Sequence, residues 1–442
     1  MRVVIAGAGN VGSTVAESLL KEGNNISLID NDEDRLKLVN QQLDVLTIKG
    51  NAVNLDVLKK AGVENSDLFI AVTNSDEVNL LSCLSAGLLN AKKKIARVRE
   101  HDYSFFETNG FGIDKIINTE EQTAIEISRL LRNVLAIEIE SFANELVQLV
   151  EMRVDENSKL LNKTIKELNI PKGLFIICSI EKEEEIIIPT MDTKFELGDR
   201  FFMVGKTEDM EKISEFLGWK GEKIKNIFIM GGGIVAELLV KNLEKYNTNV
   251  KIIEKDKQRC EVLSEKLPGY LILNGDGTDM NQLKNAGIDE MDAFVAITGD
   301  DEDNLLTALL AKQLGVKKTI AKIKRIGLIE LTELIGIDSA VNTKQITINN
   351  VLRFLRREEV VSTSLLEGGK AEVMEIIAKE NSNIIKNPLS ELNLKDALIG
   401  AILRNGEVLI PSGETVIEPN DRVVVFTLKK YISKIQKYFK SK

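Results

Sequence analysis

A glycine-rich turn near the N-terminus is the first place where this 442-residue chain could do chemistry. The segment RVVIAGAGNVG places Gly7, Gly9 and Gly12 directly after an apolar predicted strand and at the start of a predicted helix. Gly7 permits a tight turn, Gly9 lets the backbone approach a pyrophosphate, and Gly12 lets helix and strand pack closely. Because free N–H groups at a helix start attract phosphate, the spacing predicts a nucleotide site.

Asp30 ends the second predicted strand, 23 positions after Gly7. A carboxylate at this point would accept hydrogen bonds from both hydroxyls of an adenosine ribose, whereas a 2′-phosphate would meet a like charge. The pattern therefore favours NAD(H) or an adenine nucleotide such as ATP or ADP over NADP(H). A strand-to-helix turn without a ligand is the alternative reading of the same glycines.

The chain repeats this pattern in its second half. GAGNVG at 7–12 returns as GGGIVA at 231–236, and Asp30 then falls on Glu254. AGVENSDLFIAVTNSDEVNLL (61–81) matches AGIDEMDAFVAITGDDEDNLL (286–306) at 11 of 21 positions. The 442 residues are therefore two copies of a module of about 220 residues, and a second nucleotide site is predicted with Ala236 in the place of Gly12.

Polar residues also follow later strands of both copies. Arg97 follows the fifth strand of the first copy, and Lys322 holds the equivalent position in the second. Thr73 and Thr298 end the fourth strands, where carboxyl ends of parallel strands face one crevice. The alternative interpretation is a solvated cation for Arg97 and a helix N-cap for each threonine. The acidic groups that follow fit the first turn of a helix better than a metal site.

The predicted elements indicate an α/β fold. Apolar strands alternate with amphipathic, helix-length segments, which is typical of a parallel sheet covered on both faces. We expect two Rossmann-like, doubly wound parallel-sheet domains, each followed by a small α+β domain, with a helix over about 122–140 leading into the first small domain. The expected domains span residues 1–135, 136–219, 225–359 and 360–442, with a linker over 218–226.

Composition excludes several classes of protein. The formal net charge of -10 argues against binding nucleic acid through overall basicity. Three widely spaced cysteines, Cys83, Cys178 and Cys260, form no disulfide or zinc pattern, and no apolar stretch is long enough to span a membrane. The single histidine, His101, aligns with Ile326, so no catalytic histidine is common to both copies.

The order of motifs resembles a known family. IAGAGNVGSTVAESL, SLID, VTNSDEVNLLS and IARVR follow one another as in the TrkA family, the peripheral regulatory subunits of Trk-type bacterial potassium uptake, which consist of tandem RCK (KTN) modules. The resemblance covers essentially the whole chain. It implies a cytoplasmic protein without enzymatic activity that forms a tetrameric ring on the inner face of the membrane. Nucleotide binding would change the shape of the ring and gate a TrkH-like potassium-conducting subunit.

The resemblance also implies which residues contact the nucleotide. In the first module they are Gly7, Ala8, Gly9, Asn10, Val11, Gly12, Asp30, Asn51, Thr73, Asn74 and Arg97. In the second module they are Gly231, Gly232, Gly233, Ile234, Val235, Glu254, Asp276, Thr298 and Lys322. The chain departs from the family pattern twice, because Asn51 stands where the family often has aspartate and Lys322 replaces the arginine.

Two other functions fit parts of the pattern. An NAD-dependent dehydrogenase would need a positioned acid or base beside the nicotinamide, and neither predicted small domain contains a histidine. A regulator of another cation channel or antiporter would share all the features above.

Overall fold

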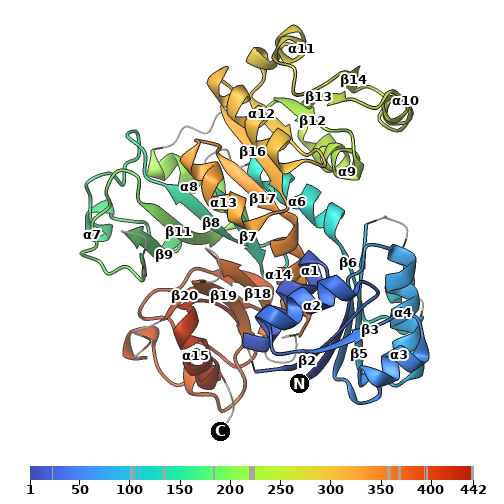
Figure 1. Cartoon of the computed structure of the whole chain (residues 1–442). Helices are drawn as coiled ribbons and strands as arrows, with labels where there is room; N and C mark the ends of the chain where they lie inside the picture. Colours follow the sequence, from blue (N-terminus) through green and yellow to red (C-terminus); the bar gives the residue numbers. More distant parts are fainter. Residues whose placement is uncertain are drawn as a thin grey trace.

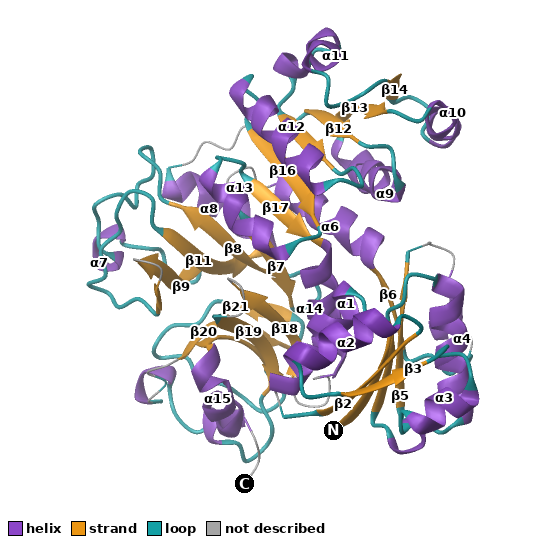
Figure 2. Ribbon diagram, in the orientation of Figure 1, coloured by secondary structure: helices purple, strands orange, loops and turns teal. Residues whose placement is uncertain are grey.

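In the computed structural model, the described part of the chain forms two parallel and two antiparallel sheets (Figures 1 and 2). The structure describes residues 1–439 except 22, 100–102, 104, 109, 133–135, 183–184, 219–223, 356–359, 367–369, 393 and 395–396. Each parallel sheet is followed along the chain by one antiparallel sheet. The predicted fold class, two Rossmann-like domains that alternate with smaller domains, is confirmed.

The first parallel sheet has the strand order β3-β2-β1-β4-β5-β6, which is that of a doubly wound nucleotide-binding fold. Its strands are β1 (Arg2–Ala6), β2 (Asn25–Asp30), β3 (Leu46–Lys49), β4 (Leu68–Ala71), β5 (Lys93–Val98) and β6 (Lys115–Asn118). Its helices are α1 (Asn10–Lys21), α2 (Glu33–Gln42), α3 (Leu55–Lys60), α4 (Asp76–Leu88), α5 (Phe105–Thr108) and α6 (Thr119–Arg132). The strand-order reversal between β1 and β4 lies at the glycine turn, where such folds bind ligands.

The second parallel sheet repeats this order as β14-β13-β12-β15-β16-β17. Its strands are β12 (Asn226–Met230), β13 (Asn249–Glu254), β14 (Leu271–Asn274), β15 (Ala293–Ala296), β16 (Lys318–Ile323) and β17 (Ser339–Asn342). Its helices are α9 (Ile234–Leu243), α10 (Lys257–Lys266), α11 (Met280–Asn285), α12 (Asp301–Gln313), α13 (Ile329–Leu334) and α14 (Thr343–Leu355).

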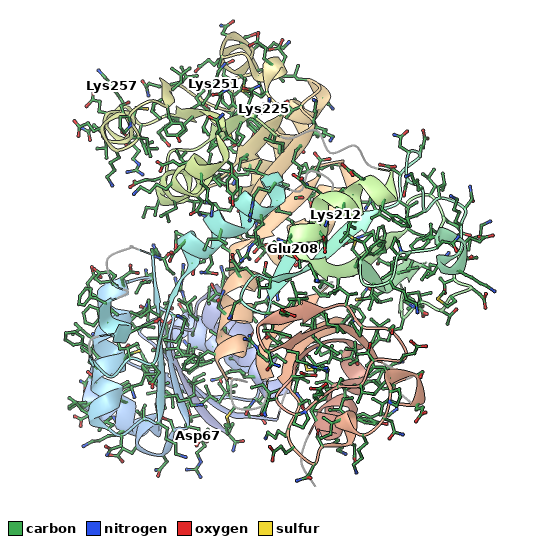
Figure 3. All side chains as sticks on the ribbon, turned by 180° about the vertical axis from the view of Figure 1, so that it is seen from behind. Asp67, Glu208, Lys212, Lys225, Lys251 and Lys257 are labelled. Atoms are coloured by element: carbon green, nitrogen blue, oxygen red, sulfur yellow. The ribbon has the colours of Figure 1, made fainter. Side chains whose placement is uncertain are left out.

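The same carboxylate contact anchors the first strand of each parallel sheet. Asp67 accepts a hydrogen bond from the Arg2 N–H at 2.9 Å, and Asp292 accepts one from the equivalent Asn226 N–H at 2.9 Å and another from the Lys225 N–H at 3.0 Å. Asp67 and Lys225 lie on different parallel-sheet domains in Figure 3. The repeat therefore extends from the sequence to individual polar contacts.

The last helix of each parallel-sheet domain packs on the other domain. Ile127 and Leu130 of α6 are buried in one core with residues of β12 and α9, although α6 belongs to the first module. Ile348 and Val351 of α14 are buried in the core of the first module, against α1. Figure 1 shows α6 beside α9 and α14 beside α1. This reciprocal exchange ties the two modules together through their hydrophobic cores.

The first small domain contains a sheet in the order β10-β9-β11-β8-β7. Its elements are β7 (Glu138–Phe142), β8 (Val147–Arg153), α7 (Ile165–Leu168), β9 (Phe175–Lys182), β10 (Glu185–Ile187), β11 (Arg200–Lys206) and α8 (Met210–Leu217). The expected helix over 122–140 is wrong at its end, because α6 stops at Arg132 and β7 already begins at Glu138. Ile139 and Phe142 of this strand are buried in two different hydrophobic cores, and the hairpin turn to β8 uses the positive-φ residues 143–145.

The second small domain has the sheet order β18-β19-β22-β20-β21. Its elements are β18 (Val360–Leu366), β19 (Ala371–Ile377), β20 (Ala397–Arg404), β21 (Glu407–Leu409), β22 (Arg422–Leu428) and α15 (Ile432–Phe439). Its sheet packs against that of the first small domain, with Phe202 and Phe426 in one core and their ring centroids 6.5 Å apart. The modules are thus joined at two levels, by exchanged helices and by stacked small-domain sheets.

None of the helices in the described part of the chain is both long enough and apolar enough to cross a membrane.

Candidate functional site

The first glycine turn has the close contacts that the sequence predicts. Gly7 has a φ of +108°, and a Cβ atom there would lie 3.0 Å from the backbone of Val72 and Thr73. A Cβ on Gly12 would lie 1.8 Å from the Gly7 carbonyl oxygen, so α1 could not approach the turn with a larger residue there. By contrast, a Cβ on Gly9 would meet only the Arg35 side chain at 3.8 Å. Gly7 and Gly12 therefore shape the turn, and Gly9 leaves its outer face open.

Asp30 braces the turn from the end of β2. One carboxylate oxygen accepts the Ala8 N–H at 2.6 Å and the other accepts the Asp32 N–H at 2.9 Å. Since a carboxylate oxygen can accept more than one hydrogen bond, both oxygens keep capacity for ribose hydroxyls. Asp30 thus has a structural role in the turn in addition to the predicted contact with a ligand.

The ends of β4 and β5 are joined by a buried amide. Asn79 on α4 accepts the Thr73 N–H at 2.8 Å and donates to the Arg97 carbonyl at 2.9 Å. The cap of α4 is Ser75, so Thr73 does not serve as the helix cap considered from sequence. Arg97 donates from Nε to Thr119 Oγ1 at 3.2 Å, which directs its guanidinium across the sheet end toward α6.

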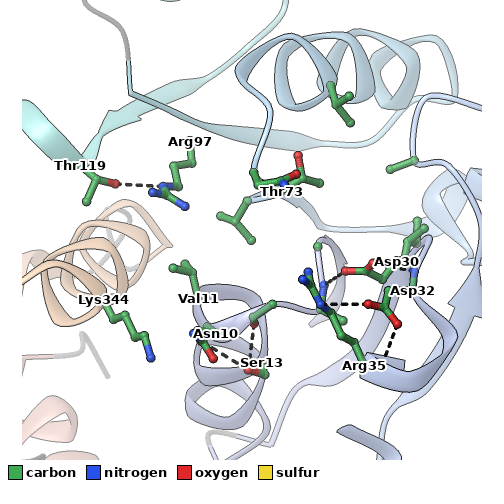
Figure 4. A pocket seen from close by; sticks show the side chains of 18 of the residues that line it. Asn10, Val11, Ser13, Asp30, Asp32, Arg35, Thr73, Arg97, Thr119 and Lys344 are labelled. Carbon is green, nitrogen blue, oxygen red and sulfur yellow. Dashed lines mark hydrogen bonds and ion pairs between the residues drawn. The ribbon is translucent and has the colours of Figure 1, made fainter. Parts of the chain in front are cut away.

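A cleft of about 960 Å³ opens at this turn, and both modules line it. The first module contributes Gly7, Ala8, Gly9, Asn10, Val11, Asp30, Asn51, Thr73, Asn74 and Arg97, all predicted from sequence. The second module contributes Val235 and Lys322, which were predicted for the second site, together with Lys324, Thr343 and Lys344. In Figure 4, Lys344 on α14 lies across the cleft from Asn10 and Val11. The helix exchange explains this arrangement, since α14 packs beside α1.

The cleft holds half-buried cations from both modules. Burial lowers the pKa of Arg97 and of Lys344, and it lowers the pKa of Lys322 to about 8. Glu120 on α6 partly offsets these charges, and its own pKa is raised by burial. Within the part of the chain that the structure describes, no carboxylate forms an ion pair with Lys322 or Lys344. Cations that are partly desolvated and only partly compensated favour the arrival of an anion.

The second glycine turn repeats the first in its backbone. Gly231 has a φ of +104°, and Glu254 accepts the Gly232 and Asp256 N–H groups at 2.6 and 2.8 Å. Asn304 joins Thr298 to Lys322 as Asn79 joins Thr73 to Arg97. Gly231, Gly232, Gly233, Ile234, Glu254, Asp276 and Thr298 do not line the cleft of the first module. Of the residues predicted for the second site, Val235 and Lys322 therefore line the cleft of the first module.

Sequence reasoning missed several residues that line the cleft. Arg99 and Lys324 lie two positions after Arg97 and Lys322, so strand alternation could have indicated them. Glu120 and Lys344 occupy equivalent positions in the two modules but carry opposite charges, and no local pattern indicated that they face one cleft.

The acidic groups after β4 and β15 have structural roles. Asp76 accepts the Arg99 N–H at 2.8 Å, and Asp301 accepts the Lys324 N–H at 3.1 Å. No group of three or more possible metal ligands occurs among the cysteine, aspartate and glutamate residues that the structure describes. His101 lies outside the residues that the structure describes.

Comparison with known proteins identifies the family. The TrkA-N domain matches residues 3–119 and 227–343, and the TrkA-C domain matches 149–218 and 373–440. The chain belongs to the TrkA family. The Trk system potassium uptake protein TrkA homolog of Archaeoglobus fulgidus is 39% identical over 100% of both chains, and TrkA homolog 1 of Methanosarcina mazei is 38% identical over 100% of both. TrkA of Vibrio alginolyticus is 34% identical over 99% of this chain and 98% of its own.

Solved structures share the fold of this TrkA family member. The RCK domain of GsuK superposes with a TM-score of 0.64 at 18% identity, covering 99% of this chain and 94% of that one. The GsuK channel bound to NAD gives a TM-score of 0.64 at 17% identity, covering 99% and 78%.

Proposed function

We propose that this protein is a cytosolic, nucleotide-binding regulatory subunit that gates a membrane potassium-uptake channel or transporter. The observation that carries the proposal is the cationic cleft at the first glycine turn, whose walls come from both modules. The relatives named as Trk system potassium uptake proteins support the link to potassium transport.

The cleft fits a polyphosphate nucleotide, and NAD(H), ATP and ADP are the proposed ligands. The backbone of Gly7 to Val11 would hold the diphosphate at the start of α1, and Asp30 would bind the ribose. Asn51, Thr73 and Asn74 would contact the rest of the ligand from the strand ends. Arg97 of the first module would pair with a phosphate group of the ligand. Lys322 and Lys344 would reach the same phosphate from the second module. GsuK, which shares the fold, has a structure bound to NAD and another bound to ADP.

Ligand binding at a cleft with walls from two modules provides a mechanism for regulation. Phosphate attracts Arg97 of the first module and Lys322 of the second, so the ligand stabilises the arrangement in which both reach it. A ligand shifts an equilibrium between two shapes by its difference in affinity for them. The stacked small-domain sheets and the exchanged helices would carry this shift to the rest of the assembly.

We propose that the assembly is a homo-oligomeric ring, in the form of a tetramer, on the inner face of the membrane beneath a TrkH-like conducting subunit. Exposed leucines on equivalent helices support self-association, because Leu81 on α4 and Leu306 on α12 are 49% and 60% exposed. Leu88 at the end of α4 is 76% exposed. Apolar groups repeated on one helix face are typical of protein interfaces. We also propose that the first three domains end at residues 135, 219 and 359.

We propose that the cleft binds its ligand without a catalytic step. Regulation by differential binding needs a cation for the phosphate and a hydrogen-bond acceptor for the ribose. The first module offers Arg97 and Asp30 for these two contacts. A dehydrogenase would need a proton donor or acceptor aimed at the nicotinamide.

Calorimetric titration of the full chain with NADH, NAD⁺, ATP and ADP tests the binding step. Spin labels placed on the two parallel-sheet domains would report the distance between modules with and without each nucleotide. We expect at least one nucleotide to bind and to change that distance. A distance distribution that nucleotide leaves unchanged at saturation would contradict the coupling.

A further inference from the structure

The second glycine turn differs from the first in two of three side chains that surround it, and the third is an arginine in both. In the first module, Ser13, Arg35 and Gln42 line the nucleotide cleft. The repeat places Glu237, Arg259 and Lys266 at the equivalent positions of the second module. The second set contains a carboxylate where the first set contains a hydroxyl.

These three residues form a closed ionic cluster at the second turn. Arg259 donates from Nε to the Gly232 carbonyl at 2.5 Å and from Nη2 to Glu237 at 3.3 Å. Lys266 Nζ lies 3.1 and 3.2 Å from the two carboxylate oxygens of Glu237, and Lys241 Nζ lies 3.5 Å away. Arg259 therefore bridges the turn and the carboxylate. Its first-module counterpart, Arg35, has a side chain that is 55% exposed and, among the residues that the structure describes, forms an ion pair with Asp32 alone, at 3.3 Å.

Glu237 is ionised and buried in this cluster. Only 8% of the residue is exposed, and although burial alone would raise the pKa of Glu237, its contacts with Lys266, Lys241 and Arg259 outweigh burial and lower it. The carboxylate lies in the first turn of α9, where the helix end favours negative charge. A phosphate brought to this turn would meet a fixed negative charge and would have to displace Glu237 from Arg259.

We propose that Glu237 closes the second glycine turn to diphosphate-containing nucleotides, so that each chain binds one nucleotide, in the cleft of the first module. This inference rests on the proposed function for its premise that the first cleft binds a nucleotide. It revises the expectation, drawn from the glycine spacing alone, of two equivalent sites. The repeated backbone then serves as a rigid support for Lys322, which the second module presents to the first site.

Calorimetric titration of the full chain with ATP and with NADH gives the stoichiometry directly. We expect one equivalent per chain and a loss of at least tenfold in affinity for Asp30→Ala. Glu237→Ser in the Asp30→Ala background leaves Arg259 and Lys266 without their carboxylate, and we expect it to create a new site of one equivalent per chain.

A converse pair of variants keeps the test independent of whether Glu237→Ser folds. Ser13→Glu places the carboxylate at the first turn, and Ser13→Gln places a neutral group of similar size there. We expect Ser13→Glu to bind ATP at least tenfold more weakly than Ser13→Gln, since only charge separates the two. Equal affinities for these variants, or two equivalents bound to the unaltered chain, would overturn the inference. Complete absence of binding to the unaltered chain would instead refute the proposed function.

Discussion

Replacing Lys322 by methionine should change the stability of this protein and its affinity for nucleotide in opposite directions. Lys322 projects into the cleft without a carboxylate partner among the described residues, and burial lowers its pKa from 10.5 to about 8. That difference corresponds to about 3 kcal/mol by which the folded state disfavours the charged form. Methionine keeps the aliphatic stem and removes the charge. We therefore expect Lys322→Met to raise the free energy of unfolding of the ligand-free protein by about 1 to 3 kcal/mol at pH 7.

The pH dependence of this gain follows from the direction of the shift. Because the folded-state pKa of Lys322 is below the unfolded value, the penalty is fully present below pH 8 and disappears as the pH rises toward 10.5. The stability difference between Lys322→Met and the unaltered chain should shrink over the same range. Urea denaturation at several pH values measures it.

The same substitution should weaken nucleotide binding. Loss of one phosphate-pairing cation is expected to cost about 1.4 kcal/mol, a factor of about 10 in Kd. Lys322→Arg retains the charge and should lose less affinity than Lys322→Met. Lys257→Met is the matched control, because Lys257 is exposed on α10, outside the cleft (Figure 3). A Lys322→Met protein that is less stable than the unaltered chain yet binds nucleotide normally would refute the reasoning.

Three further predictions follow from the same contacts. Nucleotide binding at pH 8.5 should take up protons, because an anion raises the pKa of Lys322; titration in buffers of different ionisation enthalpy measures the uptake, and none would be seen if Lys322 lies away from the ligand. Leu130→Ala, on the exchanged helix α6, should lower the free energy of unfolding by about 2 to 5 kcal/mol and reduce hydrogen-exchange protection in β12 and α9 more than in β1. An equal loss of protection in β1 would contradict the helix exchange. Leu81→Glu should dissociate the ring in light scattering while changing the protomer's stability by less than about 0.5 kcal/mol, and an intact ring would exclude α4 from the interface.

Local sequence patterns predicted the parallel sheets because their physical causes are local. The apolar runs of β1 and β4 are buried on both faces, and the Gly7 turn needs a backbone that only glycine adopts readily. The end of α6 was predicted wrongly because the segment around Ile139 can present apolar residues at helical or at strand spacing. Pairing of β7 with β8, a contact between different segments, decides for the strand.

The shared cleft could not be predicted from the sequence. An amphipathic helix must bury its apolar stripe, but the stripe of α14 does not specify which parallel-sheet domain covers it. The exchange that places Val351 against the first module also brings Lys344 to the first glycine turn. The repeat alignment paired Lys322 with Arg97 as equivalents in separate sites, whereas in the structure both residues line one cleft.

Potassium flux through the conducting subunit tests the central claim most directly. The full chain would be reconstituted with a candidate membrane potassium-conducting subunit in vesicles, and flux measured with and without ATP, ADP, NADH and NAD⁺. We expect at least one nucleotide to change the flux, and Asp30→Ala to abolish that response while the variant still binds the membrane subunit. Flux that stays constant while the unaltered chain is saturated with nucleotide would contradict the account.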